Sequence, residues 1–336
     1  MRCRYLAAAL LVATSAQAQK PLHHFVFFGG DRDAIKTDSL FLNTKSIEGA
    51  QIIYTWKFLE RGKDGYDFSE VRENLEFLKS HGKKLWIQLQ DVSFGDQKNV
   101  PEYLLKDPVY HGGAEKTYSV RGDNDELVKP SGWVARRWDP AVQERFAKLL
   151  TALGKEFDGE IEGINLPETS MEYGSTGRLF PSGYTNDIYR AAIKTNLAAL
   201  KKAFPKSVAM QYANFMPGEW RPTDDKGYLK DIYSFATSIK AAVGGPDLMP
   251  SRPGQMKSSY PLLRDAAGIV PTGLAVQDDN LAEINPKTGK KVTPLELLQF
   301  ARDDLKLDYI FWGNQEPYYS KEVIPTLRSR EMAARH

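Results

Sequence analysis

Short runs of apolar residues, many of them β-branched or aromatic, recur along the chain with polar segments between them. Runs of this kind that are bounded by Gly, Pro or Asp are typical of strands buried on both faces of a parallel sheet. Eight runs predict strands: Phe25–Phe28, Gln51–Thr55, Leu85–Gln90, Ile161–Asn165, Val208–Tyr212, Asp247–Met249, Gly273–Val276 and Tyr309–Trp312.

Segments with helical spacing separate these runs. Val71, Leu75 and Leu78 fall on one face of a helix that starts near Ser69 and stops at His81-Gly82. Three further helix starts are predicted. Pro140 stands at a first helical position, Thr185 is an N-cap, and Thr293-Pro294-Leu295-Glu296 is a capping box with Pro at the first helical position.

Eight strands alternating with helices predict a (β/α)8 TIM barrel, formed as a single domain by residues 19–336. A doubly wound open sheet is the alternative, but Gly29-Gly30-Asp31 lacks the spacing of a nucleotide-binding loop. Long segments follow the third and fourth strands, at 91–139 and 169–184. Both would lie over the carboxyl-terminal face of the barrel, where they could form a substrate cleft.

The N-terminal segment has the pattern of a secretory signal peptide. Arg2 and Arg4 precede an apolar run, and Ala16-Gln17-Ala18 is a small-x-small cleavage site, so residues 1–18 would be removed. The run is too short to span a bilayer, and no later stretch is long enough either. We therefore expect a periplasmic or secreted protein without a membrane span.

Composition narrows the chemistry. Cys3 is the only cysteine and lies in the predicted signal, so the mature chain would have no disulfide, thiol nucleophile or thiolate metal site. The chain has 45 basic and 43 acidic residues, and removal of Arg2 and Arg4 equalises them. This balance argues against a nucleic acid or an anionic membrane as partner.

Glu168 is the leading candidate for catalysis, because it follows the fourth predicted strand where a barrel places its chemistry. Asn165, three residues earlier, is a candidate to bind a substrate hydroxyl. Glu172 lies further into the loop and is expected at its rim. The alternative for Glu168 is a loop carboxylate that pairs with Arg178 or caps the next helix.

The third strand places Trp86, Gln88 and Gln90 on one face, by its period of two. Polar residues in a barrel lumen indicate either a polar site, with both glutamines binding substrate, or a satisfied buried amide network. Asp91 ends this strand and would line the floor or fix a loop.

The seventh strand leads into Gln277, Asp278 and Asp279. We expect Asp278 to be the second catalytic carboxylate and Gln277 and Asp279 to bind substrate, although Asp279 is equally suited to cap a turn. Glu316 is a third carboxylate candidate. Two aromatic candidates for substrate binding stand at strand ends: Trp56 and Trp312.

The sequence lacks the motifs of zinc enzymes and of serine hydrolases with the α/β-hydrolase fold. The histidines form neither an HExxH pair nor another zinc-ligand spacing, and no Gly-x-Ser-x-Gly elbow is present. We expect no metal and no cofactor. Carboxylates, amides and aromatics at strand ends are the residues that two-carboxylate cleavage of an oligo- or polysaccharide requires. A non-catalytic carbohydrate-binding barrel and a barrel enzyme for a non-sugar metabolite remain the alternatives.

Two short motifs resemble those of the large clan of retaining (β/α)8 glycoside hydrolases: Gly65-Tyr66-Asp67-Phe68-Ser69 and Trp138-Asp139-Pro140-Ala141-Val142. The resemblance implies that Glu168 is the acid/base and that Trp312 is the aromatic residue ending strand eight. The chain departs from the clan pattern at Pro167, which stands where asparagine is common. It also departs at Gln277-Asp278-Asp279, where the clan has a glutamate nucleophile.

Overall fold

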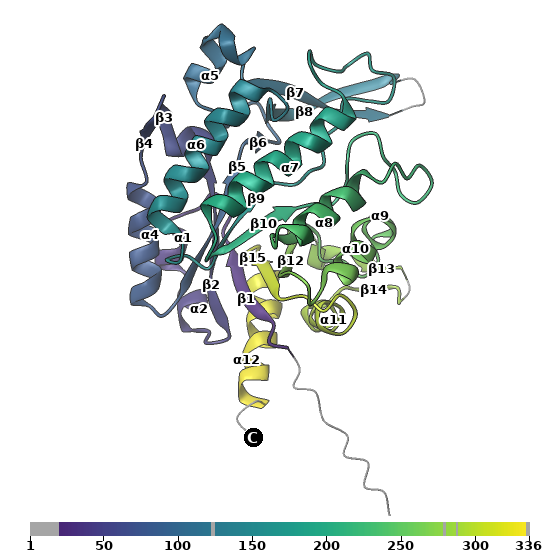
Figure 1. The fold of residues 1–336 in the computed structure, drawn as a ribbon. Coiled ribbons are helices and arrows are strands. Elements are labelled where there is room, and N and C mark those ends of the chain that lie inside the picture. The colour runs from purple at the N-terminus through teal and green to yellow at the C-terminus, as the bar shows by residue number, and fades with distance from the viewer. Residues whose placement is uncertain (1–19, 122–124, 278–279, 287, 334–336) are drawn as a thin grey trace, which may run out of the picture.

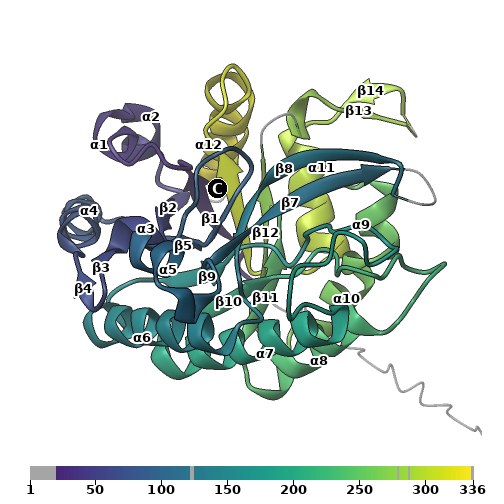
Figure 2. The same ribbon diagram turned by 90° about the horizontal axis from the view of Figure 1, so that it is seen from above.

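The computed structural model describes residues 20–121, 125–277, 280–286 and 288–333. Eight parallel strands close into a barrel in the order β1-β15-β12-β11-β10-β9-β5-β2 (Figures 1 and 2). Their bounds are β1 His23–Phe27, β2 Ile47–Thr55, β5 Lys84–Gln90, β9 Gly163–Leu166, β10 Val208–Tyr212, β11 Ala242–Gly245, β12 Thr272–Val276 and β15 Tyr309–Gly313. The (β/α)8 prediction is confirmed.

Seven of the eight predicted strands overlap an observed one, and the sixth prediction is wrong. The sixth strand is Ala242–Gly245, and the run predicted as Asp247–Met249 lies in the loop behind it. Its Ala-Val-Gly-Gly sequence has little strand propensity. Position 244 requires a residue without a side chain, because a Cβ there would lie 2.3 Å from the Gly273 carbonyl oxygen and 2.7 Å from Met210 Sδ.

The helices that cover the barrel begin close to the predicted positions. Pro140 is the first residue of α6, Thr185 caps α7 by accepting from the Ile188 N–H, and Thr293 caps α11 by accepting from Glu296. Ser69 is the first helical residue of α4 rather than its cap. The longer helices are α4 Ser69–Ser80, α6 Pro140–Phe157, α7 Asn186–Ala203, α8 Tyr228–Ser238, α10 Ser259–Ala266 and α12 Ile324–Ala333.

Shorter elements connect these. The short helices are α1 Ala34–Thr37, α2 Ser39–Asn43, α3 Trp56–Leu59, α5 Glu102–Lys106, α9 Pro253–Lys257 and α11 Pro294–Gln299; two small hairpins are β3 Glu60–Gly62 with β4 Gly65–Tyr66 and β13 Ile284–Asn285 with β14 Lys290–Lys291. Single turns of other helix types are η1 Pro108–Tyr110, η2 Asn280–Ala282, η3 Phe300–Asp304 and η4 Tyr319–Val323. Within the described residues, no helix has both the length and the apolarity that crossing a membrane requires.

The core has two parts, as a barrel dictates. Side chains that point inward fill the lumen: Phe25, Trp86, Met210, Tyr212, Ala242, Ala275, Tyr309 and Phe311. Alternate residues on the same strands point outward and pack beneath the helices in a second, larger cluster. On β5, Leu85, Ile87 and Leu89 belong to the outer cluster and Trp86 to the lumen, so the predicted alternation is confirmed.

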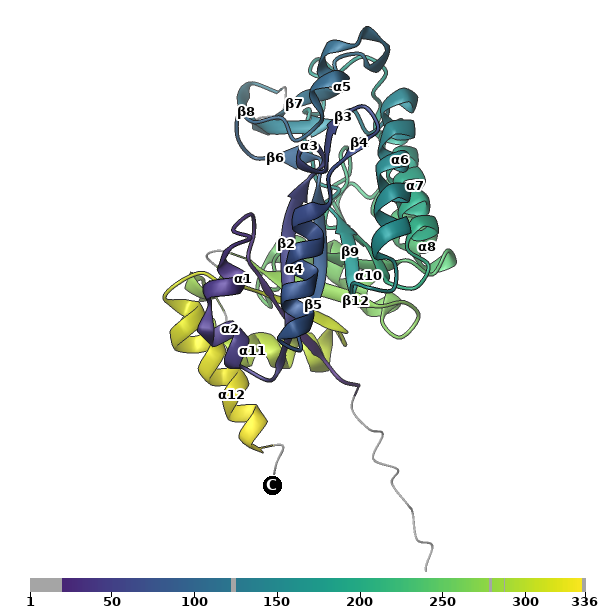
Figure 3. The same ribbon diagram turned by 90° about the vertical axis from the view of Figure 1, so that its left-hand side faces the viewer.

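Two long excursions leave the carboxyl-terminal ends of β5 and β9. After β5 the chain forms a three-stranded antiparallel sheet from β6 Val92–Ser93, β8 Leu127–Ala135 and β7 Ala114–Arg121. The second excursion, after β9, runs without helix or strand to the start of α7. Figures 1 and 3 show the β7–β8 hairpin at one end of the molecule and α12 at the other.

Candidate active site

Three polar residues stand at equivalent positions above neighbouring strands. Glu168, Asn214 and Asp247 each lie two residues beyond the last residue of β9, β10 and β11, which are adjacent in the barrel. Parallel strands in register bring such positions to the same rim, and this rim of an α/β barrel is where chemistry is carried out. The rim above β9, β10 and β11 is therefore the candidate active site.

Glu168 is fixed at both its carboxylate and its backbone. Asn214 is 5% exposed and donates its amide N–H to Glu168 Oε2. Arg137 Nη1 donates to the Glu168 backbone carbonyl at 3.2 Å. The expected alternative partner is engaged elsewhere, because Arg178 donates to the Asp125 carbonyl oxygen.

A buried ion pair between Asp91 and Arg137 stabilises the loop that contains Glu168. Arg137 donates to both oxygens of Asp91, at 2.8 Å and 2.6 Å, and to the Tyr189 hydroxyl at 2.8 Å. Arg137 and Asp91 are 4% and 3% exposed. Of the two roles expected for Asp91, the structure shows that of fixing a loop. Asp91 holds Arg137, and Arg137 donates a hydrogen bond to the backbone carbonyl of Glu168.

The surroundings of Glu168 suit an acid. Burial raises the pKa of the Glu168 carboxyl, the Asn214 hydrogen bond lowers it, and the charges of Asp247 and Arg137 act in opposite directions, upward and downward. The net direction is upward. A carboxyl with a raised pKa retains its proton to higher pH, as a general acid requires.

Asp247 is the carboxylate that sequence reasoning missed, because the misplaced sixth strand included it. Its side chain forms an ion pair with Arg252 Nη1 at 2.7 Å and accepts from Asn280 Nδ2 at 3.2 Å and Gln255 Nε2 at 3.3 Å. The backbone at Asp247 is left-handed, with φ of 64°. Non-glycine residues rarely adopt this conformation, and it is concentrated at functional sites. A Gly-Gly-Pro-Asp sequence ending a weak strand was the available signal.

The lumen beneath Glu168 contains a buried amide network. Gln51 Nε2 donates to Asn165 Oδ1 at 3.0 Å and lies 2.9 Å from the Tyr212 hydroxyl, and Trp86 Nε1 donates to the same Asn165 oxygen at 2.9 Å. Asn165 is 0% exposed. It therefore supports the floor of the site, and its predicted contact with a substrate hydroxyl is not available in this structure.

Gln88 and Gln90 share the lumen-facing side of β5 with Trp86. They are 5% and 9% exposed. Gln90 Oε1 is buried and has no hydrogen-bond partner among the residues that the structure describes. An unpaired buried carbonyl oxygen is costly, so this atom is a candidate acceptor for a donor from water or substrate.

The two predicted tryptophan platforms are wrong, because both indoles are 0% exposed. Trp312 alternates with the lumen residues of β15 and so points outward, where its Nε1 donates to His24 Nδ1 at 3.3 Å. Trp56 donates to Glu60 Oε2 at 2.7 Å and packs on Phe146. Neither ring offers a face to a ligand.

The remaining candidates follow β12 and β15. Asp278 and Asp279 lie outside the described residues. Gln277 precedes them, is partly buried, and donates its backbone N–H to Asn280 Oδ1 at 2.8 Å. Glu316 is exposed and accepts from the Ser320 hydroxyl, a position on the surface. Among the described residues, no group of three or more His, Cys, Asp or Glu side chains is placed to hold a metal ion.

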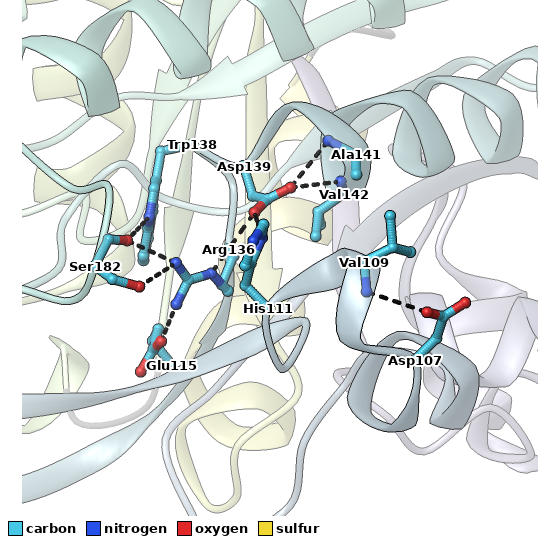
Figure 4. Close-up of polar contacts among 10 residues, drawn as sticks. All are labelled: Asp107, Val109, His111, Glu115, Arg136, Trp138, Asp139, Ala141, Val142 and Ser182. Carbon is cyan, nitrogen blue, oxygen red and sulfur yellow. Dashed lines mark hydrogen bonds and ion pairs between the residues drawn. The ribbon is translucent and has the colours of Figure 1, made fainter.

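The two excursions are joined to each other through Arg136 (Figure 4). Arg136 pairs with Glu115 of β7 and donates to the Ser182 carbonyl and hydroxyl oxygens, at 2.6 Å and 3.0 Å. Asp139 caps α6 through the Ala141 N–H and contacts His111 Nδ1 at 2.7 Å. Glu172 lies at the loop rim, as expected, and its Oε2 accepts from the Val120 N–H at 3.1 Å.

Comparison with known proteins gives fold relatives only. No protein-family model and no curated protein sequence matches the chain. Among solved structures, the catalytic domain of β-amylase from Paenibacillus polymyxa is similar with a TM-score of 0.56 and 10% identity, over 88% of this chain and 92% of that one.

Two xylanases are similar to the same degree. Xylanase 10B from Thermotoga petrophila RKU-1, solved with xylobiose, has a TM-score of 0.54 and 9% identity, over 94% of both chains. A GH10 endoxylanase from a sugarcane soil metagenome has a TM-score of 0.54 and 12% identity, over 89% of both chains. The chain thus has the (β/α)8 fold that these glycoside hydrolases share.

Proposed function

We propose that the protein is a glycoside hydrolase that acts on an oligo- or polysaccharide, with Glu168 as its general acid. The observation that carries this proposal is the environment of Glu168: a partly buried carboxyl with a raised pKa, hydrogen-bonded to Asn214 at the rim of a barrel. A carboxylic acid so placed can protonate the oxygen of a leaving sugar. The fold relatives support the proposal, since each is an enzyme of this class.

Cleavage also needs a second carboxylate that is ionised, either to attack the anomeric carbon or to activate water. Asp247 fits this role, because its carboxylate pairs with Arg252 and is oriented by hydrogen bonds from Asn280 and Gln255. Asp278 remains our prediction from the seventh strand. The separation of the catalytic carboxyls determines the stereochemistry, with about 5–5.5 Å for retention and about 6.5–9.5 Å for inversion.

A panel of plant and bacterial polysaccharides, assayed for released reducing sugar, tests the proposal. The wild type should cleave at least one polymer, and Glu168→Gln should lower kcat/KM by about 10²–10⁴-fold. Glu76→Gln is the control, since Glu76 is an exposed glutamate on α4 and does not line the cavity. No hydrolysis by the wild type, or an unchanged rate in Glu168→Gln, would overturn the proposal.

The same assay identifies the second carboxylate. Asp247→Asn and Asp278→Asn are compared, with Glu283→Gln as control because Glu283 shares the Arg252 guanidinium with Asp247. The variant that loses activity as fully as Glu168→Gln while keeping its Tm marks the partner. Binding of sugars without turnover in every variant would instead indicate a carbohydrate-binding barrel.

Export through the predicted signal is part of the same proposal, and so is action outside the cytoplasm. A barrel enzyme for a small non-sugar metabolite would need a compact apolar pocket. The described cavity beside the site is instead lined by Tyr173, Tyr184 and Trp220 together with acidic side chains. This lining favours a sugar.

A further inference from the structure

A cavity of about 550 Å³ lies beside the candidate site. The loop after β9, the loop after β10 and the β7–β8 hairpin form its walls, which include Met171, Tyr173, Tyr184, Glu219 and Trp220. Its volume is within the range of about 300–1,000 Å³ that ligand pockets occupy. Glu168 itself is not among the lining residues, so the cavity is a neighbouring space rather than the catalytic centre.

Two contacts fix the cavity wall relative to Glu168. Asn214, which holds the Glu168 carboxylate, is followed by Phe215, whose carbonyl oxygen accepts from Thr169 Oγ1 at 2.6 Å. The Phe215 ring is stacked on Trp220, with centroids 5.7 Å apart and planes 10° apart. The catalytic candidate and the cavity wall are therefore parts of one packed unit.

Trp220 is 60% exposed, whereas Trp56, Trp86 and Trp312 are fully buried. Leaving a large aromatic surface in water forgoes hydrophobic stabilisation, and exposed aromatic surface in a concave site marks a binding surface. Stacking on Phe215 leaves the opposite face of the Trp220 indole to a ligand. A sugar ring presents a flat C–H face that matches an aromatic plane.

The charge of the lining restricts the sugar. Four acidic residues line the cavity, Asp125, Glu172, Glu219 and Asp224, against one basic residue, Lys226. Backbone N–H groups hold several of these carboxylates in place. Glu219, for example, accepts from the backbone N–H groups of Tyr228 and Leu229. Carboxylate oxygens with remaining lone pairs accept hydroxyl donors and repel anions. This lining favours a neutral sugar over a uronate, sulfate or phosphate ester.

We infer that this cavity is a subsite for a neutral sugar unit of the same chain that Glu168 cleaves, with Trp220 as its stacking platform. The inference rests on the proposed function. It identifies the substrate as a neutral polysaccharide that extends past the scissile bond across the loops after β9 and β10.

The test uses the Glu168→Gln protein, so that ligands are not consumed, and measures binding of cello-, xylo- and malto-oligosaccharides from disaccharide to hexasaccharide by calorimetry. Affinity should rise with length for one series, and adding Trp220→Ala should weaken the longer members by about tenfold while leaving the disaccharide unchanged, as one lost aromatic contact predicts. Phe94→Ala is the control, because Phe94 is 72% exposed and does not line the cavity.

Kinetics separate this inference from the proposed function. In the active enzyme, Trp220→Ala should raise KM for the polymer with kcat nearly unchanged, and leave kcat/KM for a small aryl glycoside as in the wild type. If the wild type hydrolyses a polymer and Trp220→Ala changes neither KM nor length dependence, the subsite is wrong and the proposed function stands. If the wild type neither binds nor cleaves any neutral sugar, both fail.

Discussion

The pKa of Glu168 is set by its burial and by three side chains that come from different loops. Burial and the charge of Asp247 raise it, while Asn214 and Arg137 lower it. Each of these side chains can be replaced separately, and the direction of the resulting change follows from its effect on the pKa. The carboxyl thus offers a direct test of the site at the scale of single residues.

Replacing Asn214 should change the pH dependence of activity. A general acid works in its protonated form, so kcat/KM falls as pH rises through the pKa of Glu168. The Asn214 amide stabilises the ionised carboxylate, and Asn214→Ala removes that stabilisation. The pKa should therefore rise, and the descending limb should move to higher pH.

The measurement is a pH–rate profile, with Asn43→Ala as a control at an exposed asparagine. Carbon NMR titration of the Glu168 carboxyl checks the same shift without turnover. In that titration Asp247→Asn should lower the pKa of Glu168, since it removes a negative charge that repels the ionised carboxylate. A descending limb that moves to lower pH in Asn214→Ala would contradict this description of the site.

At this scale the sequence predicted the position of Glu168 but not its partners. Glu168 was recognisable because a carboxylate follows a strong strand pattern. Asp247 was missed because the predicted sixth strand included it, and Asn214 because its importance depends on which strands are neighbours in the barrel. Trp312 was misassigned although the alternation of Tyr309, Ile310 and Phe311 already placed it on the outer face.

Among the elements, β11 shows how packing overrides propensity. Its glycines are poor strand formers, but the strand fits between β10 and β12 only because Gly244 has no side chain. Local sequence cannot reveal this, since the atoms that exclude a Cβ belong to Met210 and Gly273 on neighbouring strands. The rest of the strand pattern was readable because large apolar residues carry it.

Gly244→Ala should therefore destabilise the protein by about 1–3 kcal/mol, because the added methyl group overlaps backbone and core atoms. Urea unfolding measures the change. Gly30→Ala is the control, since no atom lies within 4 Å of a Cβ at that position. Equal stability of the two variants would refute the packing argument for β11.

The ion pair between Asp91 and Arg137 connects the end of β5 to the loop of Glu168. Asp91→Asn should lower the free energy of unfolding by about 3–5 kcal/mol, because it leaves a buried guanidinium without its counter-charge. The double variant Asp91→Leu/Arg137→Met should recover most of that loss.

Denaturant unfolding of the single and double variants provides the measurement. Glu102→Gln is the comparison, since the pair between Glu102 and Lys57 is exposed and its loss should leave stability unchanged. If the double variant is less stable than Asp91→Asn, then the pair itself, rather than the uncompensated charge, stabilises this loop.

For the whole molecule, alternation of strands and helices was enough to predict a barrel, and two long excursions follow its strands β5 and β9. The tie between those excursions through Arg136 was not predictable, because Glu115 and Ser182 are far apart in sequence and meet only in the folded barrel.

The predicted signal peptide gives a prediction of its own. Expressed with its native N-terminus in a cell that exports proteins, the chain should be recovered outside the cytoplasm and begin at Gln19, after cleavage behind Ala18. N-terminal sequencing or intact mass gives the answer, and Ala16→Arg should block the cleavage. A protein that retains Met1 in the cytoplasm would refute export.

The role of Glu168 as general acid is tested most directly by its dependence on the leaving group. We would measure kcat/KM of the wild type and Glu168→Gln on a series of aryl and alkyl glycosides of one sugar, from acidic nitrophenols to simple alcohols. We expect a small loss for the nitrophenyl substrates and a loss that grows steadily as the leaving group becomes more basic, because only a poor leaving group needs a proton. An equal loss across the series, or no loss at all, would show that Glu168 is not the acid.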